Sequence, residues 1–317
     1  MMNPILRKEM KTSFRKHKIF TGTAIYVFAI MSLAAMIIIP GSILANDSSA
    51  PTVSMVAYGL VSALQLFLVY VIVPAISGSA ISGERERQTL DTLLMTKMTG
   101  KDIVKGKLMS SLMVVGLMLF AAMPVYGVIF YYGGIDIIGF IMTMVFIMAH
   151  AFYVGNIALY LSAKMKKSIV ATITTYAMII GINFALNMIT GIGSVLMSAI
   201  ALRTINNGAN QAVDMSTQIA GSAMGLIGYL SQCMGTSTSF MSLVSSVTDV
   251  EEVNFMSLMF TQGMSNGGVV DKLVDLIPLW LFNICFVVAM GMAFQMMTSA
   301  ILSPKKKRKI KKGVMQQ

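Results

Sequence analysis

Residues Ser82–Lys107 read SGERERQTLDTLLMTKMTGKDIVKGK. This is the one long charged stretch between the first and the last apolar run of the chain, which has 317 residues. Apolar residues make up 56% of the sequence and charged residues only 12%, whereas about a quarter of a soluble domain is charged. We therefore expect an integral membrane protein in which this stretch offers a surface to a partner in water.

Six apolar runs are long enough to cross about 30 Å of hydrocarbon, which takes about 20 helical residues. None of these runs contains Asp, Glu, Lys or Arg. We predict an all-α transmembrane domain over residues 19–302. Its six spans are Ile19–Ala45, Val56–Ile76, Leu108–Tyr132, Ile137–Leu161, Ile169–Ile189 and Leu276–Leu302.

The basic residues predict which side of the membrane each end of the chain occupies. With six spans, 22 of the 24 Lys and Arg residues fall on one side, and that side has a net charge of +17 against −6 on the other. Basic loops stay in the cytoplasm, so both termini are predicted to be cytoplasmic. The positive charge thus indicates topology and attraction to anionic lipids, and it requires no nucleic acid.

Three further segments flank or interrupt the spans. Residues 1–18 place Leu6, Met10 and Phe14 on one face of a basic helix, which predicts an amphipathic helix at the inner membrane interface. Residues 303–317 form a basic cytoplasmic tail suited to anionic lipid. The outer loop, residues 190–275, is predicted to form short helices that cap the outer face; a re-entrant hairpin or two further short spans are the alternatives.

Within residues 82–107 the pattern predicts two short helices. The first carries one apolar stripe, formed by Leu90, Leu93, Leu94 and Met98. Thr99, with Asp102 three residues later, is typical of a capping box at the start of the second helix, which then continues into the third span.

Polar residues inside the spans are all uncharged. They either bind helices to one another or line a translocation pathway, and the pathway candidates are Gln65, Asn156, Asn183, Asn187, Asn283 and Gln295. No catalytic or metal-ligand spacing is present. His150 has no acidic or Cys partner in any span, so we expect a packed, hydrogen-bonded histidine, and Cys233 and Cys285 indicate no disulfide framework.

Two motifs carry a family resemblance. The stretch ISGERERQTL (81–90) with Leu93, Leu94 and the later Gly106-Lys107, and the opening NPILRKE (3–9), resemble the type-2 ABC (ATP-binding cassette) exporter permeases. That family usually has Gly where Gln88 stands and often Pro where Lys97 stands.

The resemblance implies a function and a set of contact residues. Glu84–Met98 would be the coupling helix that enters a groove of a separate ATP-binding subunit, with ATP and Mg²⁺ held by that subunit and no catalysis by this chain. The docking residues would be Glu84, Arg85, Glu86, Arg87, Thr89, Leu90, Leu93, Leu94, Met98 and Lys107.

The same resemblance implies a second permease copy or a similar permease as partner, since one six-span chain makes half a pathway. The expected activity is export across a bacterial cytoplasmic membrane, with an amphipathic peptide or drug as the expected substrate. Two other readings remain open: a membrane scaffold, and a carrier driven by an ion gradient without an ATPase partner.

Overall fold

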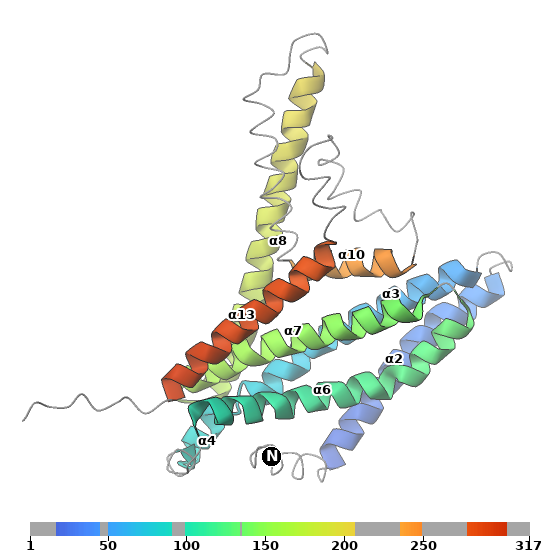
Figure 1. Cartoon of the computed structure of the whole chain (residues 1–317). Coiled ribbons are helices and arrows are strands. Elements are labelled where there is room, and N and C mark those ends of the chain that lie inside the picture. Colours follow the sequence, from blue (N-terminus) through green and yellow to red (C-terminus); the bar gives the residue numbers. More distant parts are fainter. Residues whose placement is uncertain are drawn as a thin grey trace, which may run out of the picture.

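The computed structural model describes residues 17–44, 50–90, 99–133, 135–206, 235–248 and 278–302. These residues contain eight helices and no strand, and six of the helices are long and apolar enough to cross a membrane (Figure 1). This confirms the predicted all-α class with six spans. The six are α2 (His17–Leu44), α3 (Ala50–Ser77), α6 (Gly100–Tyr131), α7 (Ile137–Lys164), α8 (Ser168–Asn206) and α13 (Leu279–Leu302).

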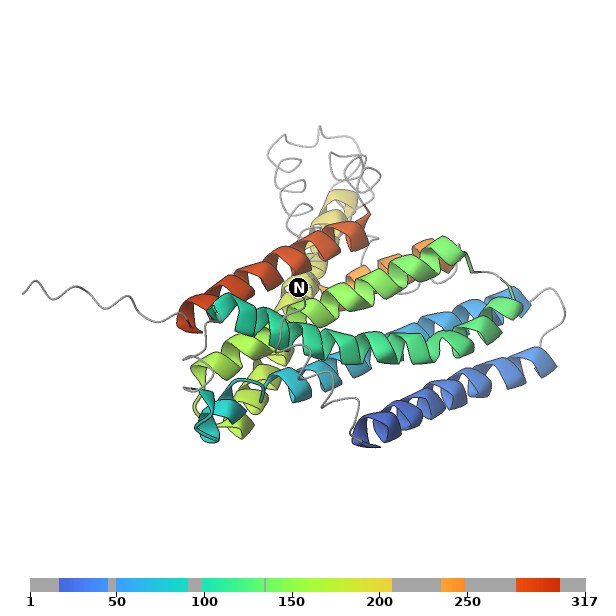
Figure 2. The same ribbon diagram turned by 60° about the horizontal axis from the view of Figure 1, so that its bottom comes forward.

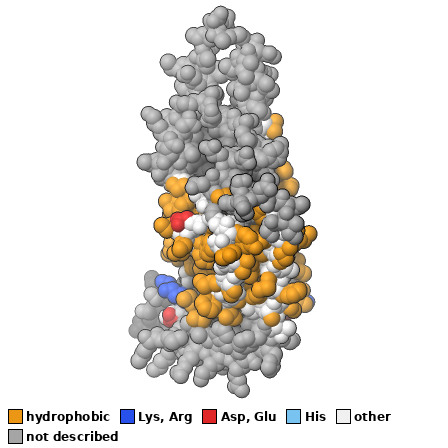
Figure 3. All heavy atoms as spheres, turned by 90° about the vertical axis from the view of Figure 1, so that its right-hand side faces the viewer, with side chains coloured by type: hydrophobic (Ala, Val, Ile, Leu, Met, Phe, Trp, Pro, Cys, Tyr) orange, Lys and Arg blue, Asp and Glu red, His pale blue; other side chains and the backbone are white. Residues whose placement is uncertain are grey.

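The outer surface of the bundle is suited to lipid, and contact with lipid requires these segments to be helical. Lipid offers no hydrogen bonds, so each span must pair its own N–H and C=O groups. Large apolar side chains such as Phe28 and Met36 of α2 are 74% and 76% exposed. The face shown in Figure 3 is largely apolar over its described surface, as expected for contact with lipid tails.

Helix α7 lies at the centre of the bundle and packs against α3, α6, α8 and α13. Small residues make this possible, because helices in a membrane approach closely where side chains are short. A Cβ atom on Gly155 would lie 2.8 Å from Leu108 Cδ1, and one on Gly291 of α13 would lie 2.7 Å from Phe152. Helix α13 therefore runs along α7, and α2 packs on α3 and α6 at the edge of the bundle (Figure 1, Figure 2).

Helix α8 is longer than its predicted span. The apolar run ends at Ile189, but the helix continues to Asn206 and is 39 residues long. At 1.5 Å per residue this is roughly 58 Å, well beyond a hydrocarbon core of about 30 Å. Hydropathy marks where hydrocarbon ends, whereas a helix ends where the backbone is interrupted, and residues 190–206 contain no proline. The far half of α8 leaves the bundle (Figure 1).

A short helix, α10 (Thr236–Thr248), lies in the segment predicted as the outer loop. It packs along the bundle rather than across its end. Its first residue contacts Asn183, about 22 Å along α8 at 1.5 Å per residue, and Val247 near its last turn packs against Gly139 at the start of α7. The cap of short helices and its alternatives, a re-entrant hairpin or two further spans, stay predictions for the outer loop.

Several predictions concern residues outside the described ranges. They are the interface helix for residues 1–16, the basic tail 303–317, residues 207–234 and 249–277 of the outer segment, and the docking residues Leu93, Leu94 and Met98.

Candidate functional site

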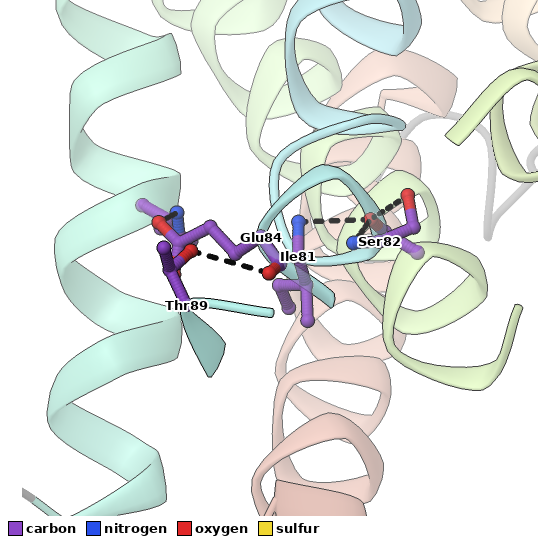
Figure 4. Close-up of polar contacts among 6 residues, drawn as sticks. Ile81, Ser82, Glu84 and Thr89 are labelled. Carbon is purple, nitrogen blue, oxygen red and sulfur yellow. Dashed lines mark hydrogen bonds and ion pairs between the residues drawn. The ribbon is translucent and has the colours of Figure 1, made fainter. Parts of the chain in front are cut away.

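The charged stretch lies at one end of the bundle, where α3 and α7 end and where α6 and α8 begin. We call this the basic end, defined by residues 82–90, 99–107 and 164–168. Beyond α3 the chain turns into the short helix α4 (Ser82–Glu86). Ser162 of α7 accepts hydrogen bonds from the backbone N–H groups of Ile81 (3.0 Å) and Ser82 (2.9 Å), so this turn is fixed on α7 (Figure 4).

Glu84 of α4 forms an ion pair with Lys107 of α6. The Lys107 ammonium nitrogen lies 2.7 Å from a Glu84 carboxylate oxygen. The Lys107 side chain is only 4% exposed and that of Glu84 is 31% exposed. Removing a lysine from water is costly unless a counter-charge is supplied, and Glu84 supplies it. The pair ties the loop to the start of α6.

Arg85 caps the end of α7. Its guanidinium group donates to the carbonyl oxygens of Ala163 and Met165, both at 2.9 Å. The last carbonyl groups of a helix have no partner within the helix, and they carry a partial negative charge. A planar guanidinium group with several donors satisfies two of them at once.

Glu86 caps the start of α8, the neighbouring helix. Its carboxylate accepts from the backbone N–H of Ser168 (3.0 Å) and from the Ser168 hydroxyl (2.7 Å). The first N–H groups of a helix lack internal partners and carry a partial positive charge, so a carboxylate is stabilised there.

Helix α4 ends in a Schellman motif centred on Gln88. The Gln88 N–H donates to Arg85 O (3.1 Å), the Thr89 N–H donates to Glu84 O (2.9 Å), and Gln88 has a φ of +57°. A left-handed residue at this position is usually glycine. The segment Glu84–Met98, which the resemblance implies to be the coupling helix, is therefore interrupted near its start, because the chain leaves the helix after Glu86.

The second predicted helix start is confirmed. Thr99 accepts from the Asp102 N–H (3.3 Å), and Asp102 accepts in return from the Thr99 N–H (3.2 Å). Helix α6 then continues from Gly100 into its span without interruption. A Cβ atom on Gly100 would lie 3.2 Å from Leu302, so the start of α6 packs against the end of α13.

The contacts sort the described docking residues into three groups. Glu84, Arg85, Glu86 and Lys107 use their charged groups within the chain, as described above. Leu90 is buried in the apolar cluster that includes Ile81, Ile103 and Leu302. Arg87 and Thr89 are exposed. Docking of a partner by this set stays a prediction, and its exposed members among the described residues are Glu86, Arg87 and Thr89.

Three of the six pathway candidates connect helices. Gln65 of α3 accepts from the Tyr126 hydroxyl of α6 at 2.5 Å. On α8, Asn183 accepts from Thr236 (3.1 Å) and Asn187 accepts from Ser237 (3.3 Å), which fixes the start of α10. A role in translocation stays a prediction for these three residues.

The other pathway candidates lie on α7 and α13, and a role in translocation stays a prediction for them too. Asn156 is buried and donates to Phe152 O at 2.9 Å within its own helix. Asn283 is buried and Gln295 is half-buried. His150 is fully buried with Nδ1 at 2.9 Å from Phe146 O, as expected for a packed, hydrogen-bonded histidine.

Sequence reasoning missed the residues that receive the loop. These residues are Ser162 and Ser168. Ser168 could have been found, because a serine at the start of an apolar run is a helix-start signal. No sequence signal marked Ser162 or the Ala163 carbonyl, because their partners lie about 80 positions away. The described residues hold no group of three or more His, Cys, Asp or Glu side chains that could bind a metal.

Six membrane-crossing helices and a polar loop fixed to three of them define a multi-pass membrane protein. The family model described as ABC-2 family transporter protein matches residues 3–214, about two thirds of the chain. The chain therefore belongs to the ABC-2 transporter family and is a transmembrane permease component of the cell membrane. A comparison with curated proteins gives no significant match.

Proposed function

We propose that this chain is the permease subunit of an ATP-driven exporter, and that residues 82–107 receive a separate ATP-binding subunit. The observation that carries the proposal is the basic end itself. In this member of the family, Glu84, Arg85 and Glu86 hold the loop against α6, α7 and α8. Arg87 and Thr89 of the same loop are exposed. A rigidly held polar loop can receive a force from outside the membrane and pass it to the spans.

The proposal assigns ATP and Mg²⁺ to the partner, and it assigns no catalytic residue to this chain. ATP-driven closure of two ATP-binding subunits would draw two such loops together, so a second copy or a similar permease completes the pathway. We place the complex in a bacterial cytoplasmic membrane with the basic end in the cytoplasm. The uncharged, Met-rich spans favour an amphipathic peptide or drug as the exported substrate.

The test is capture of the solubilised full-length chain from its native membrane, followed by mass spectrometry. We expect a soluble ATPase in stoichiometric amount, and we expect Leu93→Asp to remove it. Tyr131→Asp is the matched control, because it adds the same charge at the opposite end of the bundle, where Tyr131 is 87% exposed. An intact chain that brings no ATPase would contradict the proposal and leave the scaffold or the ion-driven carrier.

Export itself requires vesicles that contain the chain and the captured ATPase. With the basic end outside, we expect ATP-dependent uptake of a fluorescent amphipathic peptide or dye, and none with a non-hydrolysable nucleotide. Uptake driven by a proton or sodium gradient without ATP would instead support the carrier.

A further inference from the structure

Two consecutive residues of opposite charge hold two consecutive helix ends of opposite polarity. Arg85 binds the carbonyl oxygens of Ala163 and Met165 at the end of α7, and Glu86 binds the N–H and hydroxyl of Ser168 at the start of α8. We call this arrangement the Arg85–Glu86 clamp. It spans the Met165–Lys167 turn, so the loop and the turn are held as one unit.

The order of the two charges matches the polarity of the helix ends. The end of α7 carries partial negative charge and faces a cation, while the start of α8 carries partial positive charge and faces an anion. With the opposite order, each charge would face a helix end of its own sign. Arg87, one residue further on, is exposed, and no hydrogen bond or ion pair of its side chain is seen among the described residues.

Helix α8 connects the clamp to the other polar junction of the bundle. Ser168 lies in its first turn, and Asn183, four turns later, accepts a hydrogen bond from Thr236 at the start of α10. Beyond its first turns α8 is largely exposed, with Ile180 and Phe184 at 66% and 63%. The few contacts at its start therefore have a large effect on its direction, and a small tilt there is magnified along a long helix.

We propose that Arg85 and Glu86 are positioning residues that carry movement of the loop to the α7–α8 turn, and through α8 to α10. The inference rests on the proposed function, because the loop moves in response to the ATP-binding subunit. In this inference the two charges act within the chain, whereas the family resemblance implied that they contact the partner. Arg87 is then an exposed charge of the described part of the loop that a partner can reach.

The first part of the test needs no partner. Amide hydrogen exchange is measured on the full-length chain in nanodiscs, comparing Arg85→Gln and Glu86→Gln with Arg87→Gln as the matched control. We expect exchange over residues 163–172 to rise several-fold in the first two variants and to stay unchanged in the control. Equal exchange in all three variants would overturn the clamp, whether or not an ATPase is found.

The second part uses the chain with its captured ATPase. Spin labels are placed at Ile180→Cys and Ile25→Cys, both exposed, after replacement of Cys233 and Cys285 by serine. The key variant is the exchange Arg85→Glu with Glu86→Arg, which keeps the net charge of the loop and reverses both helix-end contacts. We expect it to retain the ATPase and its hydrolysis but to lose the distance change that ATP with vanadate produces in the unmodified chain.

The outcomes separate the two proposals. Loss of the ATPase from the exchanged variant, with retention by Arg87→Gln, would show that Arg85 and Glu86 bind the partner, and would overturn the inference. An unaltered distance change would overturn it as well. Absence of an ATPase from the unmodified chain would instead refute the proposed function, and with it the inference that the clamp transmits movement. Hydrogen exchange would still decide whether the clamp exists.

Discussion

The ammonium group of Lys107 lies 2.7 Å from the carboxylate of Glu84, and the lysine is the more deeply buried partner, with 4% of its side chain exposed against 31%. The two residues are 23 positions apart and belong to α4 and α6. Their pairing joins the loop after the second span to the start of the third. The difference in burial between the two partners leads to the first prediction.

Glu84→Gln is expected to destabilise the protein more than Lys107→Met. Loss of the carboxylate leaves a buried cation, at a cost of about 3 kcal/mol, whereas loss of the lysine leaves a carboxylate that water reaches in part, at a cost of about 1 kcal/mol. Thermal unfolding in detergent, followed by circular dichroism, measures both. The double variant should recover part of the loss, because it removes both charges. Equal effects of the two single variants would contradict this account.

We expect the protein to tolerate Gln88→Gly and to be destabilised by Gln88→Val. The φ of +57° at Gln88 costs a residue with a side chain about 1–2 kcal/mol, and a β-branched residue more. Gly removes this strain, but it also raises the conformational entropy of the unfolded chain, which lowers stability. The net effect of Gln88→Gly should therefore lie between zero and about 1 kcal/mol of stabilisation. Melting temperatures of the two variants test the prediction, and a lower stability for Gln88→Gly than for Gln88→Val would refute it.

Ser162→Ala is expected to loosen the turn before α4. Two backbone N–H groups, those of Ile81 and Ser82, would lose their shared acceptor, at about 1–3 kcal/mol for each buried donor left unpaired. Amide exchange over residues 79–84 should rise by at least tenfold. Ser32→Ala is the control, since its exposed hydroxyl bonds only to Ala29 O in its own helix. No change over residues 79–84 would show that Ser162 does not hold the turn.

Thr236→Val is expected to release the start of α10. The Thr236 hydroxyl donates its one hydrogen to Asn183 Oδ1. It therefore accepts a hydrogen bond from the Tyr70 hydroxyl, whose oxygen lies 3.0 Å from Thr236 Oγ1. Valine keeps the shape of threonine and removes both bonds, at roughly 0.6–1.7 kcal/mol each in a membrane. Exchange over residues 236–244 measures the effect. Ser237→Ala, which removes one longer and exposed bond to Asn187, should have less effect, and the reverse order would contradict the assignment.

Much of the fold was predictable because it depends on local properties of the chain. The fourth span was predicted as Ile137–Leu161 and is Ile137–Lys164, since uninterrupted apolar residues in lipid have to form a helix. The Thr99–Asp102 capping box was predictable for the same reason, as both partners lie within one turn. The break at Gln88 was not predicted, because a left-handed residue other than glycine leaves no mark in the sequence.

The six spans, the charged loop and the family could be identified from the amino-acid sequence, because hydropathy and short motifs involve neighbouring residues. The roles of the charges in that loop became visible only in the packed helix bundle. Glu84, Arg85 and Glu86 find their partners on α6, at the end of α7 and at the start of α8, between 23 and 82 positions away. Such pairings depend on how the helices pack, since helix ends with unpaired backbone groups attract charge from whichever segment the bundle brings beside them.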